Sequence, residues 1–301
     1  MMGYSHAVTG TAGWLALTST SGAALAIYDP GDPMFTLGGA FLCAGTAMAP
    51  DADHGQASIA HSLPPVSKWA AQGIGAVSGG HRHGTHSLIG ITVYTLVAWL
   101  LSFWVMDIEG RTVAVGSGLL AVLLVAFATK TFGLHRSVGR GFLGDLLGTA
   151  LGPWIVALGT AGLATYYMDE RWSWLPICMA VGTFIHVLGD SLTVQGVPWL
   201  WPWNPKPPRW FTNTPILKEL WLEKNGYFRL PILGRTGGSE HKSGLSWGSI
   251  RDSIVSSTLG RKGAHKTSWQ ETIFITLVTI YTLYLIAYEV LHLAGAGSML
   301  F

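Results

Sequence analysis

The sequence predicts an all-α protein, a polytopic transmembrane helical bundle with six or seven spans and a metal site at one membrane face. Of the 301 residues, 49% are hydrophobic and only 11% are charged, whereas soluble domains carry about 25% charged residues. The chain also contains 14 Trp and 39 Gly, residue types that are frequent at membrane interfaces and between packed membrane helices. Apolar stretches recur that are long enough to cross a bilayer, which takes about 20 residues.

Seven stretches are candidates for these spans. In chain order they cover residues 6–28, 34–50, 87–106, 112–130, 143–167, 172–190 and 270–293. The second stretch is short and rich in glycine, so it either crosses the membrane or forms a re-entrant helix. Pro153 lies inside the fifth stretch and predicts a kink. Short polar connections predict tight helical hairpins, at 29–33, 107–111 and 169–171.

Basic residues fall almost entirely on one side of the predicted bundle. Seven alternating spans place the N-terminus and the loops 51–86, 130–142 and 191–269 on that side. Only Arg111 and Arg171 lie on the other side, which leaves 16 of the 18 Lys and Arg residues on the first. The positive-inside rule makes the first side cytoplasmic. We therefore expect an integral protein of the inner (cytoplasmic) membrane whose N-terminus and metal site face the cytoplasm.

Residues able to bind metal ions concentrate at the cytoplasmic ends of the predicted spans. The candidate ligands are His6, Asp51, Asp53, His54, His81, His86, His186 and Asp190. His186 and Asp190 are four residues apart and therefore share one face of a helix. Ionisable residues inside an apolar span are costly and usually functional, so this pair is interpreted as two ligands of one ion. A structural hydrogen-bonded pair is the alternative.

The chemistry of these donors indicates the kind of metal site. Asp51 and Asp53 are separated by one residue, and two such carboxylates either bridge two ions or divide into a ligand and a base. Carboxylates and imidazoles without a thiolate suit Zn, Mn or Fe. The donors outnumber the four ligands of one tetrahedral ion, which predicts two or three divalent ions, with Zn preferred. Arg82 either pairs with a phosphate oxygen or anchors its loop, and His135 is interpreted as a solvated residue.

Three ordered motifs and one downstream stretch carry a family resemblance. They are Pro50–His54, Gly80–Ser87, His186–Pro202 and Phe228–Leu233. These motifs resemble the YdjM-type membrane-bound metal-dependent hydrolases, small bacterial inner-membrane proteins also described as LexA-regulated. The resemblance implies the ligand set given above, with His6 as its N-terminal member. The family usually has glycine where this chain has His83, so the role of His83 stays open.

Composition and hydropathy predict a division of the chain, and the resemblance implies a reaction. Residues 1–233 would form a membrane-embedded metal-dependent hydrolase domain, 234–269 a flexible basic cytoplasmic linker, and 270–301 a C-terminal transmembrane anchor helix. A distant kinship with zinc-dependent phospholipases C and P1-type nucleases implies phosphodiester hydrolysis. The Trp- and Pro-rich segment 196–216 is expected along the membrane interface, either as an anchor or as part of a cleft for a lipid headgroup.

Two classes of function remain open from the sequence. The first is a hydrolase that cleaves a phosphodiester, such as a phospholipid headgroup, with Asp51, Asp53 and Arg82 as the catalytic candidates. The second is a non-catalytic membrane protein such as a metal- or proton-coupled carrier. A carrier places its ligands near the bilayer midplane, whereas these ligands lie at span ends, which favours the hydrolase. The expected partner is membrane lipid, because a net charge of +2 does not indicate nucleic acid. The sequence leaves the oligomeric state unknown.

Overall fold

The chain folds into a bundle of helices in the computed structural model, which describes residues 1, 3–55, 57, 60, 66–134, 151–167, 172–214, 217–233 and 268–294. The longer helices are α1 (Gly3–Thr18), α2 (Pro33–Thr46), α3 (Val66–Val77), α4 (Leu88–Ser102), α5 (Val115–Phe132), α9 (Leu175–Ser191) and α12 (Trp269–Leu293). The shorter ones are η1 (Pro50–Asp53), η2 (Gly84–His86), α7 (Gly152–Ala157), η5 (Leu158–Gly162), α8 (Leu163–Tyr167), α10 (Arg209–Thr212) and η6 (Leu217–Glu219).

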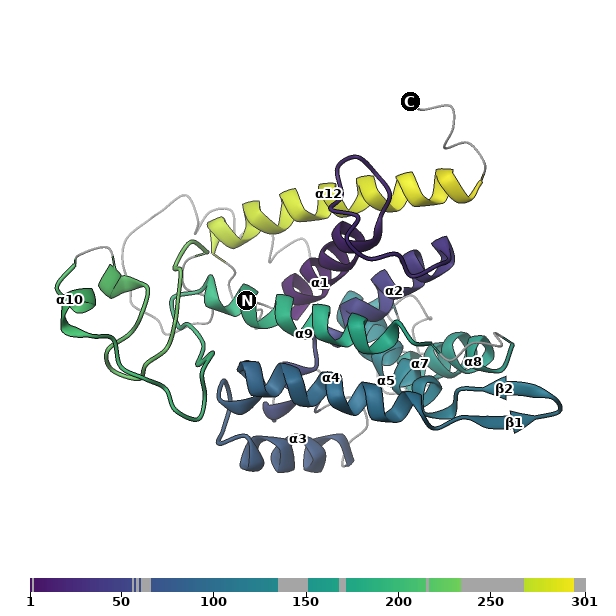
Figure 1. Ribbon diagram of the computed structural model, residues 1–301, viewed down its shortest axis with the longest axis horizontal. Helices are drawn as coiled ribbons and strands as arrows, with labels where there is room; N and C mark the ends of the chain where they lie inside the picture. Colours follow the sequence, from purple (N-terminus) through teal and green to yellow (C-terminus); the bar gives the residue numbers. More distant parts are fainter. Residues whose placement is uncertain are drawn as a thin grey trace, which may run out of the picture.

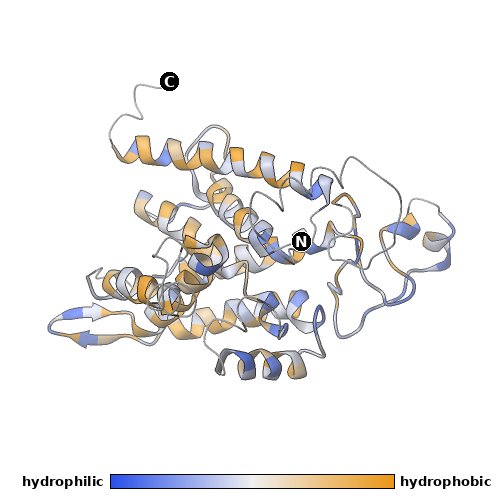
Figure 2. Ribbon diagram, turned by 180° about the vertical axis from the view of Figure 1, so that it is seen from behind, coloured by the Kyte–Doolittle hydropathy of each residue, from blue (hydrophilic) through white to orange (hydrophobic). Residues whose placement is uncertain are grey.

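Figure 1 shows α4, α9 and α12 with roughly parallel axes, while a β-hairpin projects from one end of the bundle and the segment around α10 from the other. Figure 2 shows that apolar residues predominate along α12 and in the middle of the bundle, whereas polar residues gather in the hairpin and around α10. This distribution is the one expected of a protein whose middle layer contacts hydrocarbon and whose two ends contact water.

Each of the seven predicted spans contains a helix among the described residues. The helices α5 and α12 are, within the described parts of the chain, the two that are long and apolar enough to cross a membrane by themselves. The helices α4 and α9 are apolar but shorter. The total of six or seven crossings therefore stays a prediction. In the fifth stretch, Pro153 stands in the first turn of α7, a position where proline is tolerated, and residues 143–150 lie outside the described residues.

One predicted helix extended too far, and one helix was not predicted. The first helix was expected to reach residue 28, but α1 ends at Thr18. The chain then turns back, and the backbone N–H groups of Leu25 and Ile27 donate to the carbonyl oxygens of Ala16 and Leu17. Residues 19–22 (Ser-Thr-Ser-Gly) favour this turn because serine and threonine hydroxyls compete for backbone hydrogen bonds. In addition, the region 51–86 was expected as a loop, yet it contains α3.

The all-α expectation also needs a correction at the connection after α4. Strands β1 (Met106–Ile108) and β2 (Arg111–Val113) pair antiparallel, with Met106 opposite Val113. Glu109 and Gly110 form the two-residue turn, with φ angles of 55° and 78°. Two successive left-handed residues are the pattern of a type I′ hairpin turn. The sequence predicted the polar connection but not the strands that it joins.

The core lies where α1, α2, α5 and α9 meet. Trp14, Cys43, Leu124 and Cys178 are buried there, and the indole N–H of Trp14 donates to a backbone carbonyl of α2 at 3.0 Å. The helices α2 and α9 approach closely because α9 has glycine at position 182. A Cβ atom on Gly182 would lie 1.7 Å from the hydroxyl oxygen of Thr46. This close packing carries the C-terminal turns of α9 against the end of α2.

Candidate metal centre

The candidate ligands converge at one end of the bundle, where four segments of the chain meet. His6 lies near the start of α1, and His186 and Asp190 lie in the last two turns of α9. The short helix η1 carries Asp51, and η2 ends with His86. The structure therefore brings together residues whose proximity was expected from the positions of the span ends. Their role as ligands stays a prediction.

His6, His186 and Asp190 form the deepest part of this cluster. The rings of His6 and His186 stack with their centroids 3.7 Å apart and an interplanar angle of 17°. Nε2 of His6 lies 3.2 Å from Oδ1 of Asp190, and all three side chains are at most 1% exposed. The Arg82 guanidinium lies 3.0 Å from Oδ2 of Asp190, and the Met1 amino group lies 2.5 Å from Oδ1. Asp190 is thus neutralised by cations of the chain itself.

Two histidines point their Nε2 atoms at each other. Nδ1 of His186 donates to the carbonyl oxygen of Ala47 at 2.6 Å. The Thr85 hydroxyl donates to Asp53 and accepts from Nδ1 of His86, which is 3.0 Å away. Each Nδ1 therefore carries the hydrogen, so each Nε2 is an acceptor when its ring is neutral. The two Nε2 atoms are 3.1 Å apart, a distance at which two acceptors repel unless a proton or a metal ion lies between them.

The spacing of the donor atoms also fits a metal ion. Oδ1 of Asp51 lies 3.7 Å from Nε2 of His86 and 3.7 Å from Nε2 of His186. Oδ2 of Asp190 lies 3.6 Å and 3.9 Å from the same two atoms. Two ligands bound about 2.1 Å from a tetrahedral zinc ion are about 3.4 Å from each other. The distances between these donor atoms are thus close to the distance between two ligands of one zinc ion.

Three overlapping groups of donors arise in this way. In each group the donor atoms lie within 4.8 Å of one another, and the groups are His6–Asp51–His186, Asp51–His81–His86 and His86–His186–Asp190. Asp51, His86 and His186 each belong to two groups. Of these three, the carboxylate of Asp51 is the donor that two neighbouring ions can share, whereas one imidazole nitrogen binds one ion. The residues present therefore fit a site for divalent metal ions, while the number and identity of the ions stay predictions.

Asp53 organises the loop that precedes α4. Its Oδ1 accepts from Nδ1 of His81 at 2.9 Å, and its Oδ2 accepts from the backbone N–H of Arg82 at 3.2 Å and from the Thr85 hydroxyl. Arg82 has a φ angle of 59°, a left-handed conformation that costs a non-glycine residue about 1–2 kcal/mol. The bond from its N–H to Asp53 and the pairing of its side chain with Asp190 hold it there.

Neighbouring groups keep the two aspartates of η1 charged. Burial disfavours the ionised carboxylates, but His186 and His86 hold the pKa of Asp51 well below its ordinary value. Burial likewise opposes ionisation of Asp53, yet hydrogen bonds with His81 and His86 lower its pKa. Burial lowers the pKa of His86, but hydrogen bonds with both aspartates outweigh it and raise the pKa to about 9. Both carboxylates are therefore in the form that binds metal ions at neutral pH.

Not every predicted ligand joins the three groups. The carboxylate of Asp53 is occupied by the loop, and the ring of His54 lies edge-on to the ring of His81 at 4.4 Å. A ligand role for Asp53 and His54 stays a prediction. His83 is also outside the groups, and its Nδ1 lies 3.0 Å from the carbonyl oxygen of His81. His135 and residues 234–267 of the expected linker lie outside the described residues.

Two contributors to the site were not identified from the sequence. Thr85 orients both Asp53 and His86, and its position inside the motif Gly80–Ser87 was the signal that could have indicated it. Ala47 contributes only its carbonyl oxygen. No side-chain pattern marks such a residue, because any residue type supplies the same backbone acceptor.

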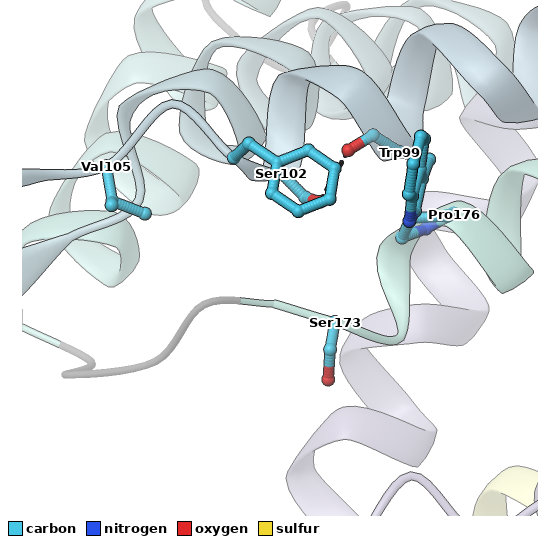
Figure 3. A pocket seen from close by; sticks show the side chains of 6 residues that line it. Trp99, Ser102, Val105, Ser173 and Pro176 are labelled. Atoms are coloured by element: carbon cyan, nitrogen blue, oxygen red, sulfur yellow. Dashed lines mark hydrogen bonds between the residues drawn. The ribbon is translucent and has the colours of Figure 1, made fainter.

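A separate pocket of about 280 Å³ lies between α4 and α9 (Figure 3). It is lined by Trp99, Ser102, Phe103, Val105, Ser173 and Pro176. These residues lie at the C-terminal end of α4 and the N-terminal end of α9, whereas His86 and Asp190 lie at the opposite ends of the same helices. The pocket is therefore remote from the cluster of metal-binding donors.

Comparison with known protein families agrees with this architecture. The family model described as YdjM inner membrane protein matches residues 1–292, a stretch that includes all the donors of the cluster and all but the last residue of helix α12. No curated protein and no solved structure matches the chain. Membership of an inner-membrane family accords with the two apolar helices long enough to cross a bilayer. Because the match covers nearly the whole sequence, the chain belongs to the YdjM inner membrane protein family.

Proposed function

We propose that this protein is a metal-dependent hydrolase that cleaves a phosphodiester, such as a phospholipid headgroup, at the cytoplasmic face of the inner membrane. The observation that carries the proposal is the set of three overlapping donor groups built on Asp51, His86 and His186. Divalent ions held there would supply an activated water at neutral pH and would neutralise phosphoryl oxygens. Two or three ions, Zn by preference, suit the carboxylate and imidazole donors.

The side chains around the donors have the task of orienting them. His186 is fixed by the carbonyl oxygen of Ala47, and His86 by the hydroxyl of Thr85, so each presents Nε2 to the site. Asp53 orients His81 in the same way, because its carboxylate accepts from Nδ1 of His81. Partners of this kind set the tautomer and orientation of a ligating histidine. Asp51, with 21% of its side chain exposed, is proposed as the bridging ligand or as the acceptor of a proton from water.

Arg82 is proposed as the group that holds the phosphoryl oxygen. Its side chain is 15% exposed, so it lies at the edge of the cluster, although the terminal nitrogen Nη1 is itself buried. One terminal nitrogen donates to Asp190, and the other, Nη1, has no hydrogen-bond partner among the described residues. A guanidinium presents its donors as a planar fork that matches phosphate geometry. The spare donor beside the cluster therefore supports an oxyanion-binding role.

The Trp-rich segment 196–216 supports approach of the substrate from the membrane interface. The backbone N–H of Leu88 donates to the carbonyl oxygen of Trp199, and the indole of Trp199 donates to Ser191 at 2.8 Å. The segment is thereby attached to both helix ends that border the cluster. Farther along it, Trp203 and Trp210 are largely exposed, as expected of side chains at the headgroup level.

The decisive experiment combines metal analysis with a hydrolysis assay on the purified full chain. Protein in detergent should contain two or more divalent ions per chain and should cleave bis(p-nitrophenyl) phosphate or a phospholipid in vesicles. Chelation should abolish cleavage, and added Zn should restore it. Asp190→Asn should lose both metal and activity, whereas His83→Gly, at a histidine outside the three groups, should keep both.

Two results would refute the hydrolase. Metal-loaded protein that cleaves no phosphodiester across a broad panel of lipids and soluble esters would remove the catalytic proposal. Metal uptake into proteoliposomes by the same preparation would then favour the carrier. Asp190→Asn protein that retained full metal content would instead remove the assignment of the donor cluster.

A further inference from the structure

Among the histidines of the donor groups, His6 differs in how it is held. His86, His186 and His81 each have Nδ1 fixed by a hydrogen bond to Thr85, Ala47 or Asp53. Nδ1 of His6 is buried and has no hydrogen-bond partner among the described residues. Its Nε2 and its stacked ring face the cluster itself. The position of His6 therefore depends on where the first turns of helix α1 lie.

The start of α1 is attached to the C-terminal helix α12. The hydroxyl of Ser5, the residue next to His6, donates to the carboxylate of Glu271 at 2.7 Å. Glu271 is completely buried, and Ser5 is 3% exposed. A carboxylate is costly to bury, so the first turn of α12 carries a polar contact that simple anchoring in lipid does not need.

The same end of α12 is also connected to the end of α9. Ser268 caps α12, because its hydroxyl accepts from the N–H of Glu271 at 3.1 Å, and it donates to the carbonyl oxygen of Leu233. The N–H of Leu233 donates in turn to the carbonyl oxygen of Leu192 at 3.0 Å, two residues beyond Asp190. The N-terminus of α12 thus contacts both segments that flank the deepest donors.

At the opposite end of α12 a second buried pair provides an internal comparison. The hydroxyl of Ser19 donates to Glu289 at 2.6 Å, and Glu289 is 3% exposed. This pair resembles Ser5 and Glu271, although the carboxylate of Glu289 also accepts from the backbone N–H of Thr20 at 3.3 Å. It joins the same two parts of the chain, but it lies at the other end of α1, 13 residues after His6, or about 20 Å along a helix.

We propose that Glu271 is a positioning residue for the metal centre, which sets His6 among the other donors by fixing the first turn of α1. The inference rests on the proposed metal centre and goes beyond it, because it makes α12 a part of the site and not only a membrane anchor. Glu289 then serves only to hold the two helices together.

Metal affinity of the full chain in detergent tests this assignment, measured by competition with a chromophoric chelator. Ser5→Ala and Glu271→Ala should each lower the affinity for Zn about tenfold or more, the range found when a partner of a ligating histidine is removed. Ser19→Ala and Glu289→Ala should change it less than about threefold, although thermal unfolding should show a comparable loss of stability. Glu271→Gln keeps an acceptor for Ser5 and should retain the affinity.

Several outcomes overturn the proposal. Equal losses of affinity from the Ser5 and Ser19 variants would mean that α12 contributes only to general stability. Unchanged affinity in Ser5→Ala, or a loss in Glu271→Gln as large as in Glu271→Ala, would refute the hydrogen-bond account. Wild-type protein that binds no metal would overturn this proposal and the metal centre together. Protein that binds metal but hydrolyses nothing would overturn the hydrolase alone.

Discussion

Replacing Gly182 by alanine should weaken metal binding from a position that supplies no ligand. Gly182 lies at a close approach between α9 and the end of α2. One turn later on α9, Nδ1 of His186 donates to the carbonyl oxygen of Ala47 on the α2 side, at 2.6 Å. Because this hydrogen bond orients a shared donor, a change in the distance between the two helices should reach the metal centre through it.

The size of the displacement follows from the contacts of the added methyl group. The new Cβ would lie 1.7 Å from Oγ1 of Thr46 and 2.9 Å from the backbone nitrogen of Ala47, where ordinary contact begins at 3.4 Å. Even if the hydroxyl rotates away, Cβ of Thr46 stays 2.8 Å from the new Cβ, so the backbone must move by about 0.6 Å, the difference between 3.4 and 2.8 Å. If it cannot rotate, the shift is about 1.7 Å, which is 3.4 minus 1.7 Å. Overpacking of this kind costs about 1–3 kcal/mol, and misorienting His186 should cost about 10- to 100-fold in metal affinity.

The assay is thermal unfolding by Trp fluorescence together with chelator competition, on wild type, Gly182→Ala and Gly38→Ala. Gly38 lies within helix α2, and a Cβ atom there would meet nothing within 4 Å. Gly38→Ala should therefore leave metal affinity unchanged and should stabilise the helix by up to about 1 kcal/mol. Gly182→Ala protein that matched wild type in both stability and affinity would refute the reasoning.

Three further results are expected. Arg82→Ala should leave metal content unchanged and raise KM for a phosphodiester about tenfold or more, because a charged hydrogen bond contributes about 1.5–3 kcal/mol; metal loss in this variant would argue against a role in binding substrate. Thr85→Val should lower metal affinity by about 10-fold, measured by chelator competition, since it removes the hydroxyl that orients His86; an unchanged affinity would count against that role. Metal binding should release protons, and its affinity should rise as the pH rises towards about 9. The reason is that His86 keeps its proton up to that pH in the metal-free protein and must lose it to bind a metal ion. Isothermal titration calorimetry in buffers of different ionisation enthalpy would detect the released protons, and an affinity independent of pH would contradict this expectation.

Hydropathy predicted the positions of the helices well where one apolar run was uninterrupted. The stretch 270–293 differs from α12 by one residue at its start. Failures occurred where a local effect competed with hydropathy. The helix α1 ends ten residues earlier than its apolar stretch, at Thr18 instead of residue 28, because the chain folds back on itself there. The β-hairpin at 106–113 was missed because three-residue strands are too short for an alternating pattern to be recognised.

For the site, the sequence predicted which residues lie close together. It did not predict which of them present donor atoms and which orient those donors. Span ends on one side must lie near each other in a bundle, which sufficed to group His6, Asp51, His86 and Asp190. The distinction between a donor and a residue that orients donors depends on distances of a few tenths of an ångström. Asp53 illustrates the point, because its sequence position is equivalent to that of Asp51, yet its oxygens are taken by the loop.

The balance of charge at the cluster would couple metal binding there to the arrangement of the neighbouring side chains. Asp51, Asp53 and Asp190 lie close together and largely buried. Three carboxylates in such a place are stable only with compensating positive charge. In the chain alone this charge comes from Arg82 and Met1 beside Asp190 and from a proton on His86. Divalent ions would take over that role, which would release the Arg82 guanidinium from Asp190 for an anionic substrate. Metal binding at the carboxylates would then also free the Arg82 side chain to bind a phosphodiester.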